Sequence, residues 1–448
     1  MTDSIEAKLD LLQDLIRRAQ KRGADAADAV FVEGTSQSLS WRLGAVEQLE
    51  RSEGQDLGLR VFVGRSQAIV SSSDTGRDAL DELVERAVAM AKIVPADPYA
   101  GIADPGQLAT EFLDFDMFDP SEPSAEELKD MARRAEQAGM AVTGVTNSEG
   151  AGAGFAHTRV AMAASNGFAR SYARSSHSLS ASMLAGEGTG MERDYDYTGA
   201  VWAGDLRTPE DIGQSAGEKA VKRLNPKKAK TQQVPVIYDP RAARSLLSHL
   251  SGAINGSSIA RGTSFLKDML GKDVFAPGVT VVDDPHRMRG LRSAPFDDEG
   301  LPTARRDVVD SGRLTTWLMD LRSARQLGLA STGHASRGVS SPPSPSATNF
   351  YFAPGALTPK QLMADIKAGF YVTELIGMGV NSVTGDYSRG ASGFWIEDGE
   401  IAHAVSEVTV AGNLKDMFKA LTPADDLVFR YGVDAPTVRI DGMTLAGS

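Results

Sequence analysis

The chain has 448 residues, of which 42% are hydrophobic and 24% charged, a composition typical of a water-soluble globular protein of two or three domains. Its 47 basic and 59 acidic residues give a formal net charge of −12, which repels phosphate backbones and argues against nucleic-acid binding. The absence of cysteine excludes disulfides, thiolate metal ligands and a cysteine nucleophile. The sequence has neither a signal-peptide core nor an apolar run of the about 20 residues that a membrane span needs, so we expect a cytoplasmic protein without membrane contact.

The first half of the chain alternates helical and strand patterns. Residues 29–71 predict short strands with glycine turns between them, and residues 142–185 predict further antiparallel strands. Residues 95–123 are rich in Pro, Asp and Gly, so we expect them to run over the surface, where they could divide this half in two. Helical spacing of apolar residues, with capping or proline starts, predicts helices at residues 5–22, 74–94, 124–137 and 209–224.

A polar, basic stretch at residues 225–230 is interpreted as the linker between two domains, residues 1–230 and residues 231–448. The second half begins with a predicted strand, and strand patterns dominate it. Helices are predicted there at residues 240–253, 358–367 and 411–421. Runs of strands with occasional helices predict an α+β fold, with helices packed on antiparallel strands in a mixed N-terminal half and with a strand-rich C-terminal domain.

Residues 213–217 read G-Q-S-A-G and fit the G-x-S-x-G string of serine hydrolases. That chemistry needs the serine on a sharp turn between a strand and a helix. Here Ile212, Ala216 and Ala220 place the string inside a helical pattern. We interpret it as a helix with small residues on one face and not as a nucleophile site.

The histidines do not form a zinc-binding pattern. A helical zinc-peptidase site needs two His four or five residues apart on one helix, with a Glu beside the first. His249 lies in a predicted helix without a second ligand, residues 283–286 are interpreted as a polar turn, and residues 297–300 as an acidic turn. We therefore assign no catalytic, metal-binding or cofactor-binding residue, although convergence of distant residues stays open. The six histidines of the chain are His157, His177, His249, His286, His334 and His403.

Seven short strings carry more information than the composition. Residues 295–303 read P-F-D-D-E-G-L-P-T, and residues 331–337 read S-T-G-H-A-S-R. The others are residues 58–61, 384–388, 396–401, 411–414 and 436–442. In this order they resemble the blocks of the TldD/PmbA peptidase family, whose older label is modulator of DNA gyrase and which usually has Asn where this chain has His334. The resemblance covers nearly the whole chain.

The family has two branches, and the resemblance places this chain in the zinc-less one, TldE/PmbA. TldD-like chains carry H-E-x-x-x-H on the helix that opens the second half, and a Cys near the carboxy terminus. Residues 261–264, R-G-T-S, resemble the stretch that follows this helix, and counting back places Leu247, Ser248 and Gly252 at the His, Glu and His positions. His249 is out of register by two residues. The resemblance thus implies no metal, cofactor or catalytic residue in this chain, and zinc in a TldD-like partner.

What the resemblance implies is the non-catalytic subunit of a heterodimeric metallopeptidase that cleaves unfolded or extended peptides, including peptide-antibiotic precursors and antitoxin proteins. The isolated chain could also form a homodimer. Two alternatives stay open: an independent peptidase with an unrecognised site, and a non-enzymatic regulator that binds gyrase or toxin–antitoxin proteins. Because both branches share the D-D-E-G block, we expect residues 297–300 to serve a structural role at a domain or subunit junction.

Overall fold

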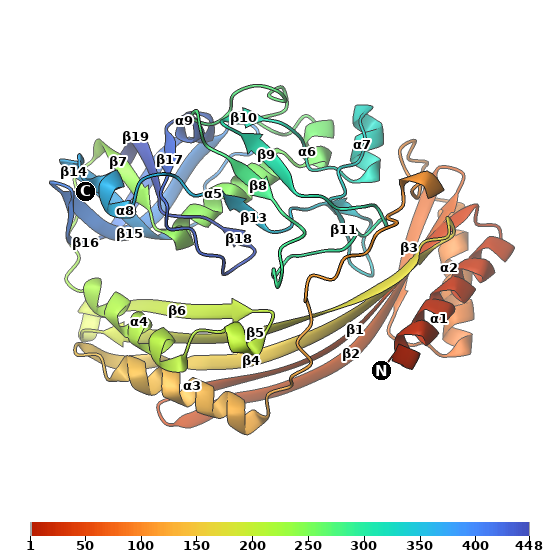
Figure 1. The fold of residues 1–448 in the computed structure, drawn as a ribbon, viewed down its shortest axis with the longest axis horizontal. Helices are drawn as coiled ribbons and strands as arrows, with labels where there is room; N and C mark the ends of the chain where they lie inside the picture. The colour runs from red at the N-terminus through yellow and green to blue at the C-terminus, as the bar shows by residue number, and fades with distance from the viewer. Residues whose placement is uncertain (1, 448) are drawn as a thin grey trace.

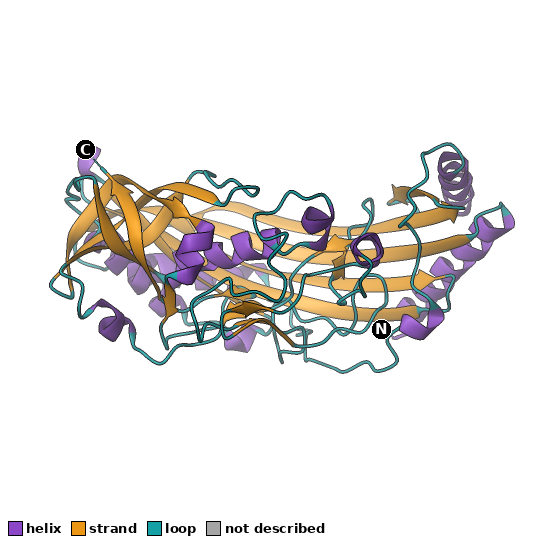
Figure 2. Ribbon diagram, turned by 90° about the horizontal axis from the view of Figure 1, so that it is seen from above, coloured by secondary structure: helices purple, strands orange, loops and turns teal. Residues whose placement is uncertain are grey.

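The longest strands of the chain form one curved, six-stranded antiparallel sheet (Figures 1 and 2). The computed structural model describes residues 2–447. The strand order is β3-β2-β1-β4-β5-β6, so consecutive hairpins extend the sheet and β1 pairs with β4 at its centre. The strands are β1 (Ala26–Arg42), β2 (Ala45–Val63), β3 (Ser66–Ser72), β4 (Val145–Ala164), β5 (Ala169–Ala185) and β6 (Glu192–Ala200).

The strands β1 and β2 are single strands of 17 and 19 residues joined by one tight turn. The prediction of short strands with glycine turns between them is therefore wrong here. Gly34 and Gly54 lie opposite each other inside the ladder, and neither has a positive φ. A glycine marks a turn only where the chain uses its left-handed conformations, and the turn itself uses Leu43 and Gly44, both with positive φ.

Four helices cover the outer face of the sheet in two pairs (Figure 1). Leu59 and Ala161 point to α1 and α2 at one end, while Ala153 and Leu179 point to α3 and α4 at the other. Burying each leucine in this way contributes roughly 1.5–3 kcal/mol. The helices are α1 (Thr2–Lys21), α2 (Arg77–Ala91), α3 (Ala125–Met140) and α4 (Pro209–Lys222).

Small residues bring α4 into close contact with α3. The side chain of Thr208 caps α4 by accepting a hydrogen bond from the backbone N–H of Asp211. A Cβ added to Gly213 would lie 1.8 Å from the carbonyl oxygen of Ala135 in α3. The helical interpretation of residues 213–217 is thus confirmed, and the G-x-S-x-G string has no strand-to-helix turn on which a hydrolase serine could act.

The residues after α4 form a second body against the inner face of the long sheet (Figure 1). Its larger sheet has the order β16-β15-β14-β7-β19-β17, and pairing of β16 with β19 closes five of these strands into a barrel around Val236, Phe370 and Ile440. The strands are β7 (Gln232–Tyr238), β14 (Ala368–Ile376), β15 (Asp386–Glu397), β16 (Glu400–Asn413), β17 (Leu421–Pro423) and β19 (Val438–Ala446).

A second, smaller sheet and five short or medium helices complete this body. The sheet has the order β10-β9-β8-β13-β18, and β11 pairs with β12 separately. These strands are β8 (Val281–Asp283), β9 (Arg306–Asp310), β10 (Arg313–Leu314), β11 (Ala335–Ser336), β12 (Ser344–Pro345), β13 (Phe350–Phe352) and β18 (Val433–Asp434). The helices are α5 (Pro240–Ala253), α6 (Gly256–Ala260), α7 (Leu321–Leu327), α8 (Pro359–Met363) and α9 (Leu414–Lys419). The predicted α+β class, with a strand-rich C-terminal part, is confirmed.

Residues 95–123 are partly exposed, as expected, but they also contact both bodies, and their last residues pass onto the outer face of the long sheet. Asp97 accepts a hydrogen bond from Arg322 of α7 at 2.6 Å, and the backbone N–H of Ala109 donates to Gly300. Ala103 and Phe115 are buried. Apart from the short 3-10 helix Pro105–Gln107 the segment is irregular, and composition does not reveal which residues of an irregular segment another part of the fold covers.

Among the described residues, none of the helices is both long and apolar enough to cross a membrane.

We expect Gly213→Ala to lower the melting temperature, because the new Cβ overlaps the backbone of α3. Overpacking of this kind costs about 1–3 kcal/mol. The matched control is Gly252→Ala, also within a helix, where an added Cβ meets no heavy atom within 4 Å. That control should leave stability unchanged or raise it by up to about 1 kcal/mol through helix propensity. Equal melting temperatures for the two variants would contradict this account of the α3–α4 contact.

Candidate functional site

The helix α5 occupies the place where the resemblance expects zinc ligands. Leu247 is fully buried in the core, whereas Ser248 and Gly252 are exposed. The Ser248 hydroxyl already donates to the carbonyl oxygen of Arg244 at 3.4 Å. Zinc needs three or four nitrogen, sulfur or carboxylate oxygen ligands, and a leucine, a serine and a glycine do not supply them. Within residues 2–447, no group of three His, Cys, Asp or Glu side chains is placed to hold a metal ion.

The histidines near this helix and in the second body have structural neighbours. His249 packs edge-on against Tyr387, with ring centroids 6.0 Å apart, and burial lowers its pKa, as does the charge of Arg389. His286 contacts Thr303 Oγ1 at 3.0 Å. His334 lies 3.1 Å from the carboxylate of Asp283, which is completely buried. The interpretation of residues 283–286 as a polar turn holds for Pro285 and His286 but is wrong for Asp283, which is buried at the end of β8.

Two further histidines lie on the outer face of the long sheet. His157 and His177 project from β4 and β5 and are almost fully buried. His177 Nε2 is 3.4 Å from Asp119, and His157 Nδ1 is 3.6 Å from Glu122. These two acids come from the segment that leads into α3, so the four side chains link that segment to the sheet.

The D-D-E-G block forms a turn whose carboxylates bind backbone N–H groups. Asp297 accepts hydrogen bonds from Glu299 at 3.0 Å, from Leu301 at 2.9 Å and from Ala335 at 3.2 Å. Asp298 accepts one from the backbone N–H of Arg337 at 2.8 Å. The turn at residues 297–300 is thereby fastened to the S-T-G-H-A-S-R block, and both lie at the junction of the two bodies, where the acidic turn was expected to serve.

A buried ion network joins these blocks to the long sheet. Asp28 of β1 accepts a hydrogen bond from Arg60 Nε at 2.9 Å and an ion pair from Arg337. Burial alone would raise the pKa of Asp28, but the two guanidinium groups outweigh burial and hold it below the usual value. Close by, a Cβ added to Gly58 would lie 1.9 Å from the carbonyl oxygen of Val339. Within the string at residues 58–61, Gly58 therefore allows close contact with the backbone of Val339, and Arg60 supplies the charge that pairs with Asp28.

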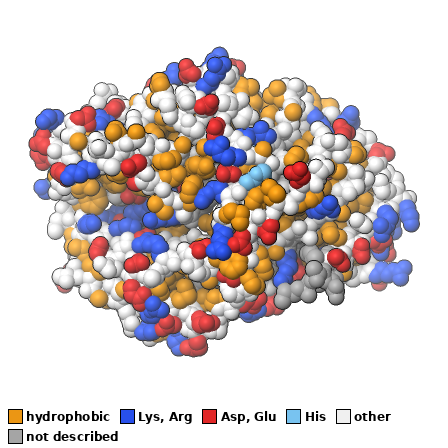
Figure 3. Space-filling model, in the orientation of Figure 1, with side chains coloured by type: hydrophobic (Ala, Val, Ile, Leu, Met, Phe, Trp, Pro, Cys, Tyr) orange, Lys and Arg blue, Asp and Glu red, His pale blue; other side chains and the backbone are white. Residues whose placement is uncertain are grey.

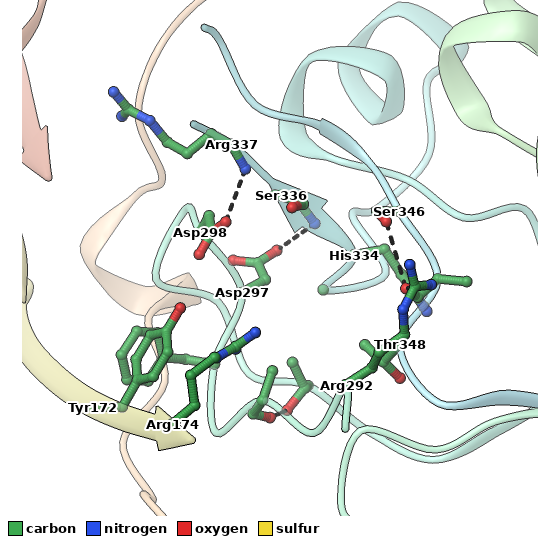
Figure 4. A pocket seen from close by; sticks show the side chains of 16 residues that line it. Tyr172, Arg174, Arg292, Asp297, Asp298, His334, Ser336, Arg337, Ser346 and Thr348 are labelled. Carbon is green, nitrogen blue, oxygen red and sulfur yellow. Dashed lines mark hydrogen bonds between the residues drawn. The ribbon is translucent and has the colours of Figure 1, made fainter. Parts of the chain in front are cut away.

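Beside this junction lies a cavity of about 300 Å³ between β5 and the loops of the second body. Figure 4 shows Tyr172, Arg174 and Asp298 on one side of it and Arg292 and Thr348 on the other. Its remaining wall comes from residues of the two blocks, including Asp297, His334 and Ser336. The acidic residues were visible in the sequence as part of a motif. Tyr172, Arg174 and Arg292 belong to no motif, and only the tertiary structure brings them here.

Burial raises the pKa values of the three carboxyl groups in the acidic turn. It raises the pKa of Asp297 against the three backbone hydrogen bonds, and it raises the pKa of Asp298. Burial also raises the pKa of Glu299, and the charge of Asp297 adds to the effect while Arg60 offsets part of it. Glu299 uses one oxygen to accept the backbone N–H of Leu321 at 2.7 Å. Asp297 is buried, Asp298 and Glu299 are half-buried, and each of the three has at least one carboxylate oxygen bonded to a backbone N–H group.

The geometry defines an α+β protein of two bodies with a sealed ionic junction, an adjoining cavity and no metal-ligand set on α5. Comparison with models of protein families identifies three domains of one family along the chain. Residues 27–91 match PmbA/TldA metallopeptidase domain 1, residues 118–224 match the central domain, and residues 231–447 match the C-terminal domain. This chain belongs to the PmbA/TldD metallopeptidase family.

Relatives support that assignment over the full length. The Metalloprotease PmbA of Escherichia coli O157:H7 is 39% identical over 99% of this chain and 98% of its own length. The Metalloprotease TldD homolog of Buchnera aphidicola (subsp. Acyrthosiphon pisum) is 26% identical over 51% of each chain. Both branches of the family are therefore detectable from this sequence, with the stronger match to PmbA.

Solved structures have the same fold. A candidate modulator of DNA gyrase from Bacteroides thetaiotaomicron superposes with a TM-score of 0.90 at 26% identity, covering 98% of both chains. TldE from Thermococcus kodakarensis superposes with a TM-score of 0.84 at 20% identity, covering 98% of this chain and 100% of its own. The second similarity is one of fold.

We expect stability to fall as pH rises from 5 toward 9, in part through Glu299. Its folded-state pKa is raised, so its contribution is complete below the pKa of the unfolded chain and is lost as pH rises through the folded pKa. The slope is at most about 1.4 kcal/mol per pH unit for each such group. Glu299→Gln, whose amide oxygen can still accept the Leu321 N–H, should flatten the curve of unfolding free energy against pH. Glu82→Gln on the exposed face of α2 is the control, and an unchanged slope in Glu299→Gln would contradict the prediction.

Proposed function

We propose that this chain is the zinc-less subunit of a two-subunit, TldD/TldE-type metallopeptidase, working in the cytoplasm on unfolded or extended peptides. The observation that carries the proposal is the donor set on α5. The chain shares the fold and the blocks of a metallopeptidase family, yet Leu247, Ser248 and Gly252 cannot act as zinc ligands or as a general base. The similarity to a protein named TldD homolog, alongside the stronger PmbA match, supports a partner of the zinc-binding branch.

The inner face of the long sheet supports a role in holding extended chains. Ser176, Ser178 and Ser180 of β5 are exposed. On the outer face, Leu179 is buried beneath α3 and α4, and His177 is buried beside Asp119 of the segment that leads into α3. Ser38 of β1 is likewise exposed. Figure 3 shows the molecular surface hollowed between the two bodies, with Lys and Arg side chains along the hollow. Small hydroxyl side chains leave room for an extended peptide and place few demands on its sequence.

An open strand edge offers a second means of holding a peptide. The strand β3 pairs only with residues 57–63 of β2, and residues 45–54 of β2 are exposed. Main-chain groups at such an edge can hydrogen-bond an added strand, and this mode of binding depends little on side chains. An edge of this kind suits a subunit that presents varied sequences to a catalytic partner.

The isolated protein should contain no stoichiometric zinc. Purification without chelator followed by elemental analysis is expected to give far less than one zinc per chain, because no described cluster of His, Asp or Glu supplies a ligand set. A tight zinc at about one per chain would contradict the prediction and would favour an independent metallopeptidase.

Peptide cleavage should require a TldD-like subunit. Amide hydrolysis at neutral pH needs an activated water or nucleophile, and neither α5 nor the helical Ser215 provides one. An unstructured labelled peptide should stay intact with this chain alone and be cut by the pair. The pair with Glu→Gln in the partner's H-E-x-x-x-H motif should lose at least about 10²-fold in rate, as expected for loss of a general base.

The control for that assay is the same three-way comparison with a chelator. Cleavage by the pair should stop when zinc is removed and return when it is restored. Chelator-resistant cleavage by this chain alone would refute the proposed function.

A further inference from the structure

The cavity beside the acidic turn contains two arginines that lack a carboxylate partner. Neither Arg174 nor Arg292 forms an ion pair within 4.0 Å in residues 2–447. Arg174 lies over the ring of Tyr172, with its guanidinium carbon 5.1 Å from the centroid. The guanidinium of Arg292 donates only a long hydrogen bond of 3.4 Å to the carbonyl oxygen of Ala347. Both side chains border a volume that a small group can enter.

Other arginines at the junction of the two bodies have partners across it, although Arg244 and Arg325 reach hydroxyl or carbonyl oxygens and no carboxylate. Five of them reach across to a carboxylate: Arg223 to Glu374, Arg241 to Asp194, Arg289 to Asp116, Arg322 to Asp97 and Arg337 to Asp28. The chain carries an excess of 12 negative charges, so carboxylates are not scarce. The two cavity arginines therefore differ from these five in having no carboxylate within 4.0 Å, and Arg174 acts on Asp298 only from a greater distance.

The acids of the cavity do not fill this role. Both oxygens of Asp297 accept from backbone N–H groups, those of Leu301 and Ala335, and one oxygen of Asp298 accepts from Arg337. Burial lowers the pKa of Arg292 even though the side chain reaches water, and the charges of Arg244 and Arg174 lower it further against Asp283 and Asp434. The carboxylates of Asp283 and Asp434 thus act on Arg292 only from beyond 4.0 Å, and an anion bound in the cavity would pair with it directly.

We propose that this cavity binds a carboxylate group of an extended peptide, with Arg174 and Arg292 as the residues that hold it. A guanidinium presents planar donors that match a carboxylate, and such charge-assisted hydrogen bonds are among the strongest. A volume of about 300 Å³ suits a terminal residue or an acidic side chain and excludes a folded domain. The exposed serines of β5 lead directly to Arg174, since Ser176 is the next residue on the same face. That the ligand is a peptide rests on the proposed function; the carboxylate site does not.

The test is direct binding to the full chain alone, so that it does not depend on cleavage or on a partner. A fluorescent unstructured peptide without acidic residues is compared with the same peptide capped as a carboxy-terminal amide, by fluorescence anisotropy. The free acid should bind at least about tenfold more tightly, as expected for charge-assisted hydrogen bonds. Its affinity should fall with added salt, whereas the amide should show a much weaker salt dependence.

Three variants locate the effect. Arg174→Gln and Arg292→Gln should each remove most of the preference for the free acid. Arg174→Lys keeps the charge and should retain part of it. Arg170→Gln is the matched control: this arginine is on the same strand and face as Arg174, but it lies over Phe112 outside the cavity, and its loss should leave the preference intact. The melting temperature of each variant is measured to confirm that it folds. If Arg174→Gln or Arg292→Gln fails to fold, the remaining Gln variant and the salt dependence of the native chain still test the proposal.

A third peptide identifies the source of the carboxylate. An amide-capped peptide with one internal glutamate that binds as tightly as the free acid, and loses affinity in both Gln variants, assigns the site to acidic side chains and supports the proposal. Equal binding of free acid and amide, with no gain from the internal glutamate, overturns it. So does an undiminished preference for the carboxylate in folded Arg174→Gln and Arg292→Gln. Absence of peptidase activity in the pair would refute the proposed function and leave this result standing.

Discussion

The two bodies of the protein meet around one buried carboxylate. Asp28, on the central strand of the long sheet, lies between Arg60 of the neighbouring strand and Arg337 of the second body. Removing one partner from such a buried network costs about 3–5 kcal/mol, because the remaining charge is left unpaired. That is a large share of the about 5–15 kcal/mol that stabilises a typical domain. The intact network need not stabilise the fold more than apolar packing would. It does fix how the two bodies dock, since a one-residue slip of β1 would turn Asp28 to the opposite face of the sheet.

The helix α5 is held by capping and burial, as the proposed zinc-less role requires. Asp239 caps the helix by accepting a hydrogen bond from the N–H of Arg241, and Leu246, Leu247 and Leu250 anchor it in the core. Its stability therefore comes from capping and burial, and none of it depends on a metal. At position 247, where a ligand is expected in the zinc branch, a leucine buries its whole side chain and contributes roughly 1.5–3 kcal/mol.

The long sheet separates two kinds of surface by the alternation of its side chains. On the outer face, Leu179 and Ala181 of β5 are sealed by helices, and on the inner face the intervening serines stay open. Further along the same face, Arg174 is half-buried at the cavity. One strand thus supplies both the core that holds α3 and α4 and the polar surface that the proposed peptide ligand would follow.

The sequence by itself determined the fold class, the four helices that cover the long sheet, and the family. Periodicity, capping and short motifs are local properties of the chain, so they can be read without the structure. Ser124 and Glu127 form the predicted capping box, and the serine of the G-x-S-x-G string lies in a helix as its apolar spacing indicated. It also located the acidic turn at 297–300 as a structural element. The lengths of β1 and β2 could not be predicted from the sequence. A glycine such as Gly34 or Gly54 can lie in a strand or in a turn, and only its strand partner shows which.

Only the tertiary structure decided where the chemistry gathers. Ala103, Ala109 and Phe115 are buried because the second body packs against them. Asp283 is buried because His334 and Thr348 come to it from more than 50 residues away. Arg174 and Arg292 are 118 residues apart, and nothing around either one marks it in the sequence. The pattern of a strand tells which face a side chain takes, but the presence or absence of an opposing charge is set by long-range packing, which no local pattern encodes.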